Sequence, residues 1–213
     1  MNFLSEIASH GFLVVAIGPM PAEGQCGGPG GPTKSALMTE AINWAIAQNS
    51  APLSQYYHKL DVSKIAVAGM SCGGLQTLET APDARITTAM ICNSGILGDP
   101  GSGMGGMPKL TKDYLDKLHT PVIYILGGER DIAYKNGMDD FRRINRLPVF
   151  AANLNVGHGG TYSKPHGGDF AVVATAWLQW QLKGDQQAAK MFEGDPCGVA
   201  QLPGWNMEKK NIP

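Results

Sequence analysis

Gly69-Met70-Ser71-Cys72-Gly73 is the stretch that decides the fold. The residues before it, 64–68, read Lys-Ile-Ala-Val-Ala and are short and apolar, as a buried strand is. The residues after it, 73–79, can carry a helix away from the strand. The sequence therefore predicts a strand, a sharp turn at Ser71 and a helix.

That context gives the G-x-S-x-G pattern a chemical meaning. A serine at a strand-to-helix corner is held in a strained backbone conformation that lifts its hydroxyl above the sheet. We expect Gly69 and Gly73 to be small because the strand and the helix approach closely there. The backbone N–H of Cys72 then lies at a helix N-terminus, where it can stabilise an oxyanion. The pattern predicts Ser71 as a nucleophile; a glycine-rich turn that contains a serine by chance is the alternative.

Strand-like and helix-like segments alternate along the rest of the chain. Short apolar runs predict buried strands over 12–17, 85–93, 121–126 and 148–155. Helical spacing of apolar residues predicts helices over 3–9, 33–49, 111–119, 138–146 and 168–183. This alternation predicts one α/β domain over residues 1–213, with a mostly parallel sheet between two layers of helices. We expect the tail from Gln186 onward to wrap the surface.

Two segments rich in glycine are predicted loops. Residues 18–32 follow the predicted strand 12–17, and residues 94–108 follow the predicted strand 85–93. Loops at the carboxyl ends of parallel strands build sites, so Pro19 to Gln25 are candidates for lining one. The second loop is either a flexible surface loop or the wall of an adaptable pocket. The pattern assigns no substrate-binding residue.

A nucleophilic serine needs a base and a carboxylate that orients the base. In a parallel sheet both must follow the carboxyl ends of later strands. Asp131 follows the strand 121–126 and His158 follows the strand 148–155, so we predict His158 as the base and Asp131 as the acid. The order serine, aspartate, histidine is that of the nucleophile-elbow fold.

Other acids and histidines are weaker candidates. Glu129 could replace Asp131, whereas Asp139 and Asp140 fall within a predicted helix and are expected to be solvated. His166 is expected to cap the next helix or to be exposed. The three remaining histidines lie at the wrong end of the predicted sheet: His10, His58 and His119.

Composition excludes several kinds of partner. Seventeen basic against eighteen acidic residues leave no field for nucleic acid or for an anionic membrane. No apolar run is long enough to span a bilayer, and the first residues lack the basic and apolar regions of a signal peptide. The four cysteines, Cys26, Cys72, Cys92 and Cys197, lack metal-type spacing, so we predict no metal and no cofactor. Their disulfide pairing and the oligomeric state stay open.

These motifs resemble the α/β-hydrolase superfamily, in particular dienelactone-hydrolase-like and cutinase-like esterases, including secreted fungal members. The matching stretches cover nearly the whole chain: residues 8–12, 69–74, 128–134 and 157–162. The resemblance implies a serine carboxyl-ester hydrolase that acts on a small-molecule ester through an acyl-enzyme, with Ser71, Asp131 and His158 as its triad. It also implies an extracellular location.

The start of the chain departs from that fold. There, the strand that carries the second oxyanion donor precedes the first helix, and this chain opens at that helix. The absent strand would lie between the strands 12–17 and 64–69. Either these two neighbours pair directly or the chain is N-terminally truncated, and we favour truncation. A truncated, non-catalytic protein of the same fold is therefore the alternative function, and Cys72 is the alternative nucleophile.

Overall fold

The protein is a three-layer α/β fold built around a mostly parallel sheet, as predicted. The computed structural model describes residues 2–18, 33–99 and 106–213. The strands follow each other across the sheet in chain order: β1 (Ile65–Met70), β2 (Ile86–Cys92), β3 (Val122–Leu126), β4 (Val149–Leu154) and β5 (Trp205–Lys210). The first four strands are parallel, and β5 runs antiparallel to β4.

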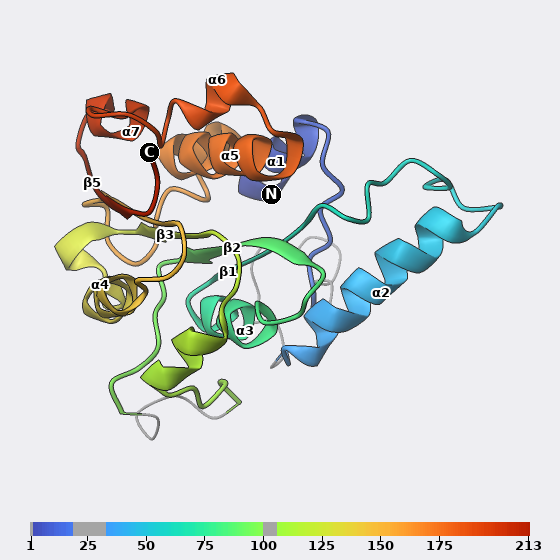
Figure 1. The fold of residues 1–213 in the computed structure, drawn as a ribbon, viewed down its shortest axis with the longest axis horizontal. Helices are drawn as coiled ribbons and strands as arrows, with labels where there is room; N and C mark the ends of the chain where they lie inside the picture. Colours follow the sequence, from blue (N-terminus) through green and yellow to red (C-terminus); the bar gives the residue numbers. More distant parts are fainter. Residues whose placement is uncertain (1, 19–32, 100–105) are drawn as a thin grey trace.

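Helices cover both faces of this sheet (Figure 1). One face carries α1 (Asn2–Ser9) and α5 (Gly168–Lys183), and the opposite face carries α3 (Cys72–Thr80) and α4 (Tyr134–Arg143). The α2 helix (Ala36–Ser50) lies beyond α3 at the outer side of β1. Shorter helical segments complete the described chain: η1 (Lys112–Lys117), η2 (Gly128–Arg130), η3 (Pro165–Gly167), α6 (Gln186–Ala189) and α7 (Gly198–Gln201).

Side-chain alternation along the strands divides the core into two clusters. Tyr124 packs in the cluster that contains Leu78 of α3, whereas its neighbour Ile125 packs in the cluster that contains Phe170 and Trp177 of α5. Successive side chains of a strand point to opposite faces, so the period of two fills both cores from the same strands. All five residues of β3 are buried. The carboxyl ends of these central strands are therefore fixed by packing on both faces.

The predicted helices are present, with shifted bounds. The α5 helix occupies 168–183 as predicted, and the segment predicted over 111–119 is the short 3-10 helix η1. The α4 helix begins at Tyr134, four residues before its predicted start. No helix formed by the described residues is both long enough and apolar enough to cross a membrane.

The prediction of a buried strand over 12–17 is wrong. Among the described residues, β1 pairs only with β2, and the segment 12–17 forms no ladder with any strand. An apolar run becomes a strand only where another strand satisfies its backbone N–H and C=O groups. Direct pairing between 12–17 and β1, the first of our two expectations, is therefore also wrong.

A largely apolar cavity lies between this segment and the edge of the sheet instead. It has a volume of about 490 Å³ and is lined by residues 11–17, by residues 64–68 of β1 and its approach, and by apolar residues of α2. Val15 is 43% exposed, and of the six residues of β1 only Val67 is buried. This side of the molecule is much less densely packed than the centre.

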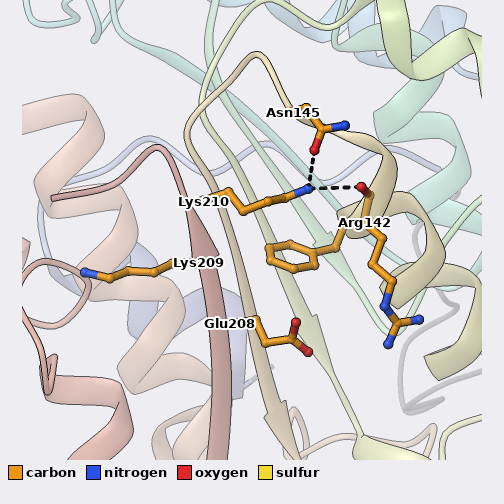
Figure 2. Close-up of a pocket in the computed structure, with 6 residues that line it drawn as sticks. Arg142, Asn145, Glu208, Lys209 and Lys210 are labelled. Atoms are coloured by element: carbon orange, nitrogen blue, oxygen red, sulfur yellow. Dashed lines mark hydrogen bonds between the residues drawn. The ribbon is translucent and has the colours of Figure 1, made fainter.

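The tail from Gln186 does more than wrap the surface, because its last segment adds β5 to the sheet. Lys210 anchors this strand: its Nζ donates to the carbonyl oxygen of Arg142 at 3.1 Å and to Oδ1 of Asn145 at 2.9 Å (Figure 2). The same ammonium lies 4.9 Å from the ring centre of Phe141. The residues that line the hollow in Figure 2 thus connect β5 with the end of α4. β5 covers the outer edge of β4.

The first predicted glycine-rich loop lies almost wholly outside the described residues, and the second lies partly outside them. Pro19 to Gln25, which we expect to line a site, are not described, nor are residues 100–105 of the second loop. The described beginning of that second loop, residues 94–96, is buried, and Ser94 bonds to Ser71 of the candidate site.

Candidate active site

Ser71 lies at the corner between β1 and α3, where the sequence predicts it. Its backbone has φ +56° and ψ −119°, a conformation that a residue with a side chain rarely adopts. Two hydrogen bonds hold the corner: Ser71 N–H donates to the carbonyl of Cys92 at 3.0 Å, and Oγ of Ser94 donates to the carbonyl of Ser71 at 2.7 Å. The strained serine is therefore tied to the end of β2.

The close approach at this corner depends on Gly69 and Gly74. A Cβ on Gly69 would lie 2.1 Å from the carbonyl oxygen of Gly73, and one on Gly74 would lie 2.3 Å from Cβ of Ser94. A Cβ on Gly73 would meet no described atom within 4 Å. The expectation that Gly69 must be small is confirmed, whereas Gly74 takes the place that we expected for Gly73.

The structure brings the three predicted side chains into contact. Asp131 follows β3 and η2, and His158 follows β4, so all three lie beyond the carboxyl ends of parallel strands. Nε2 of His158 lies 3.0 Å from Oγ of Ser71. Nδ1 of the same ring lies 2.7 Å from Oδ1 of Asp131. These are hydrogen-bond distances for a nucleophile, its base and an orienting carboxylate.

Asp131 is buried but richly hydrogen-bonded. Burial alone would raise its pKa; donation from the N–H groups of Ala133 and Gly127, and from His158 and Asn93, outweighs burial and lowers the pKa instead. The carboxylate is therefore ionised at neutral pH.

The ionised carboxylate determines the tautomer of His158. A carboxylate can only accept, so Nδ1 of His158 must carry the proton that it donates to Asp131. Nε2 is then left with a lone pair facing the hydroxyl of Ser71. This arrangement can accept a proton from Ser71.

The weaker candidates lie elsewhere. Glu129 is exposed and His166, at 84% side-chain exposure, pairs with Glu6 at the surface, which confirms its expected exposure. Asp139 is partly exposed, but the expectation that Asp140 is solvated is wrong. Its side chain is fully buried, and burial raises its pKa to about 6.

Asp140 is buried because donors from other elements surround it. Its Oδ2 accepts from the N–H of Ile96 at 2.8 Å, and its Oδ1 accepts from Nζ of Lys112 at 2.6 Å. The helical pattern of α4 alone does not reveal these partners. Asp140 fixes the segment after β2 and makes no contact with Ser71, His158 or Asp131 in the described structure.

The described cysteines are free thiols. Cys72 is half-buried, while Cys92 and Cys197 are buried, and burial raises the pKa of Cys92 to about 12. Cys26 lies outside the described residues, as does any pairing that involves it. No group of three potential metal ligands occurs among residues 2–18, 33–99 and 106–213.

Sequence reasoning missed the contribution of β2 to the site. Asn93 and Ser94 directly follow this strand, and they bond to Asp131 and to Ser71 respectively. The rule that selects Asp131 and His158, namely polar residues just beyond the carboxyl end of a parallel strand, selects Asn93 only once the strand is known to end at Cys92 and not at residue 93 as predicted.

The site and the fold point to a hydrolase of the α/β class, and comparison with known proteins points the same way. A protein-family model described as PETase, PET hydrolase-like, matches residues 1–95, which is less than half of the chain. The matched part includes Ser71 and Cys72 but ends before Asp131 and His158. It supports an ester hydrolase of α/β-hydrolase type. No curated protein sequence matches the chain.

Proposed function

We propose that the protein is a serine carboxyl-ester hydrolase. The observation that carries this proposal is the continuous contact from Oγ of Ser71 through the ring of His158 to the buried carboxylate of Asp131. The family match at the nucleophile supports the same reaction class. We assign Ser71 as nucleophile, His158 as general base and acid, and Asp131 as the group that orients the imidazole.

In the first half of the reaction Ser71 attacks the ester carbonyl. Its proton passes to Nε2 of His158, and the imidazolium is stabilised by the charge of Asp131. The carbonyl oxygen becomes an oxyanion as the tetrahedral intermediate forms. Collapse of this intermediate breaks the bond to the alcohol, which takes the proton from His158 and leaves an acyl-enzyme on Ser71.

The second half repeats these steps with water. His158 removes a proton from a water molecule that attacks the acyl carbonyl, and then returns a proton to Oγ of Ser71 as the acid departs. Both halves need the same tautomer of His158, which is why an ionised, buried Asp131 matters.

Cys72 supplies one oxyanion donor in this mechanism. It is the first residue of α3, where a backbone N–H has no carbonyl one turn earlier. The position next to the nucleophile aims this N–H at the oxygen of a substrate bound to Ser71. A second donor has no assigned residue.

The proposed substrate is a small carboxylic ester, and the proposed location is extracellular, by resemblance to cutinase-like and dienelactone-hydrolase-like enzymes. Ser71 is half-buried and the side chain of His158 is 27% exposed, so an ester can reach both from solvent. The family model that matches residues 1–95 is described as PET hydrolase-like. A short-chain aryl ester is therefore the first probe.

The test combines covalent labelling with turnover. We expect the wild type to be labelled by a fluorophosphonate and to hydrolyse the aryl ester, and Ser71→Ala to do neither. His158→Ala should lower kcat by more than about 1000-fold. His166→Ala is the matched control, because this exposed histidine lies eight residues away and should leave kcat unchanged.

Two outcomes would contradict the proposal. Labelling or turnover that persists in Ser71→Ala would remove Ser71 as nucleophile, and labelling that depends on Cys72 instead would transfer the role to the neighbouring thiol. A folded wild type that is neither labelled nor active would favour a non-catalytic protein with this fold.

A further inference from the structure

We infer that Asn93 is a positioning residue that holds Asp131 in the orientation required by His158, and that Tyr162 fixes the amide of Asn93 in turn. This inference rests on the proposed function, because it gives Asn93 its role through Asp131. The side-chain hydrogen bonds of Asn93 go to Asp131, Gly157 and Tyr162 and not to Ser71 or His158, so it acts on the reaction through Asp131.

The contact between Asn93 and Asp131 is short and fully buried. Asn93 is 0% exposed, and its Nδ2 donates to Oδ2 of Asp131 at 2.7 Å. A second, longer contact of 3.4 Å runs from the same Nδ2 to the carbonyl oxygen of Gly157, next to His158. Asn93 therefore contacts both loops that carry the predicted acid and base.

The two carboxylate oxygens of Asp131 accept hydrogen bonds from different donors. Oδ1 accepts from His158 and from the N–H of Ala133, whereas Oδ2 accepts from Asn93 and from the N–H of Gly127. Asn93 is the only side-chain donor to Oδ2 among the described residues. A hydrogen bond to the oxygen that faces away from His158 fixes the rotation of the carboxylate and leaves Oδ1 directed at the ring.

The orientation of the Asn93 amide is determined by its neighbours. An ionised carboxylate can only accept, so the NH₂ group of Asn93 must face Asp131. The hydroxyl of Tyr162 donates to Oδ1 of Asn93 on the other side. Burial raises the pKa of Tyr162 far above its ordinary value, so this hydroxyl keeps its proton. A flipped amide would set its oxygen against the carboxylate of Asp131, which has no proton to donate.

Tyr162 is itself held by aromatic packing. Its ring stands edge-on to Phe3 of α1, with 5.1 Å between centroids, and edge-on to Phe170 of α5, with 5.4 Å. The chain of contacts thus runs from the α1 and α5 layer through Tyr162 and Asn93 to Asp131. The acid takes its position from a packed core and not from a mobile loop.

The backbone at Asn93 explains why an asparagine occupies this position. Its φ is +44°, in the left-handed region that asparagine, aspartate and glycine tolerate better than other residues. Among these three residues, only asparagine brings a neutral amide donor. Asn93→Gly is therefore the informative variant, since it suits the backbone and leaves Oδ2 of Asp131 without its side-chain donor.

Loss of this donor should change the contact between Asp131 and His158. Without Asn93 the charge of Asp131 is less neutralised, and the imidazolium beside it becomes more favourable. Asn93→Asp does not test this, because two adjacent buried carboxyl groups hold one proton between them and the protonated group donates to the other. We expect the NMR signals of the His158 ring protons to shift in Asn93→Gly.

The kinetic expectation follows from the same change. The acidic limb of kcat/KM should move to higher pH, and kcat at neutral pH should fall about 10- to 100-fold, the range for a lost hydrogen bond to a charged group. KM should change little, because Asn93 is buried away from substrate. Tyr162→Phe, which keeps the ring and removes the hydroxyl, should show a smaller shift in the same direction.

Asn153→Gly is the matched control. Asn153 is another buried asparagine, located on β4, and its Nδ2 contacts Sδ of Met138 and not the site. This variant also removes a buried amide, so it can lower stability, but it should leave the NMR signals of His158 and the acidic limb of kcat/KM unchanged.

The outcomes separate this inference from the proposed function. If the NMR signals of His158 and the acidic limb of kcat/KM are the same in folded Asn93→Gly as in the wild type, the positioning role of Asn93 is wrong, even where Ser71→Ala abolishes hydrolysis. If the wild type is inactive, the proposed function fails, and the NMR comparison still decides whether Asn93 controls the Asp131–His158 pair.

Discussion

The β1 edge of the sheet is packed less firmly than the strands β3 and β4, and the candidate site takes residues from both regions. Every residue of β3 is buried, and β4 is buried in all but its last residue. On the other side only Val67 of β1 is buried, and a cavity of about 490 Å³ separates this strand from residues 11–17. Asp131 and His158 follow the packed strands, whereas Ser71 follows β1.

This difference shows what must hold Ser71 in place. The outer edge of β1 contributes no strand pairing in the described residues, so Ser71 depends on β2. Its N–H and its carbonyl both bond to residues at the end of β2, Cys92 and Ser94. β2 also supplies Asn93 to the acid. β2, which lies between β1 and β3, therefore aligns the residues of the candidate site.

The largest expected contrast is between two phenylalanines. Phe150 on β4 is fully buried and packs edge-on against Phe192, while Phe12 is partly buried at the cavity. Phe150→Ala should lower the free energy of unfolding by about 3–5 kcal/mol, because it leaves a void in a packed core. Phe12→Ala should lower it by less than about 2 kcal/mol, because its ring already borders open space.

Urea denaturation of both variants measures this contrast. Equal losses would mean that the side of the molecule around residues 12–17 is packed as firmly as the centre in solution. Nζ of Lys183 lies 4.3 Å from the ring centre of Phe12 and also donates to the carbonyl oxygen of His10 at 2.6 Å, so Lys183→Met is a control for the joint loss of these two contacts.

The next contrast is electrostatic and concerns α4. The unfolded chain releases the proton of Asp140 near pH 3.8, but the folded protein retains it to about pH 6 because of burial. The stability that Asp140 contributes is therefore fully present below about pH 4 and is lost as the pH rises to about 6. A shift of about two units corresponds to about 3 kcal/mol.

Comparison with Asp140→Asn isolates this contribution. The difference in unfolding free energy between wild type and Asp140→Asn should fall by about 2 kcal/mol between pH 4 and pH 6.5. Asp139→Asn is the control, because hydrogen bonding to Lys112 lowers the pKa of Asp139. The difference in unfolding free energy between wild type and Asp139→Asn should therefore rise over this pH range. A flat difference for Asp140→Asn would show that its carboxyl group titrates normally in the folded protein.

The sequence predicts best where local pattern and tertiary environment agree. The apolar run of β3 and the periodicity of α5 each describe an element that is buried on the side its pattern indicates, and both were predicted nearly to the residue. Ser71, Asp131 and His158 were found because a motif and a rule about strand ends constrain the same edge of the sheet.

The predictions that are wrong concern segments whose structure depends on a partner elsewhere in the chain. Residues 12–17 have the composition of a strand, but composition does not reveal whether another strand pairs with them. The sequence analysis does not predict β5, because it identifies strands by apolar runs and an edge strand tolerates charged residues such as Glu208, Lys209 and Lys210. Asp140 was misplaced because its donor Lys112 lies 28 residues away in the chain.

The smallest contrast tests the cavity directly, by adding volume. Ala68 on β1 lies in one cross-strand row with Met90, Ile123 and Phe150, and it lines the cavity. Ala152, on the same face at β4, is fully buried. Ala152→Leu should lower the free energy of unfolding by about 1–3 kcal/mol, since extra methylenes must displace neighbours in a packed core.

Ala68→Leu should be neutral or should stabilise by up to about 1 kcal/mol, because the new side chain fills space that the structure leaves open. Urea denaturation of both variants, with hydrolysis of the aryl ester followed alongside, measures the effect. Because Ser71 is held from β2, activity should survive in Ala68→Leu. A loss of stability comparable to that of Ala152→Leu would mean that other atoms of the protein already fill the cavity in solution, and that the two sides of the sheet are packed alike.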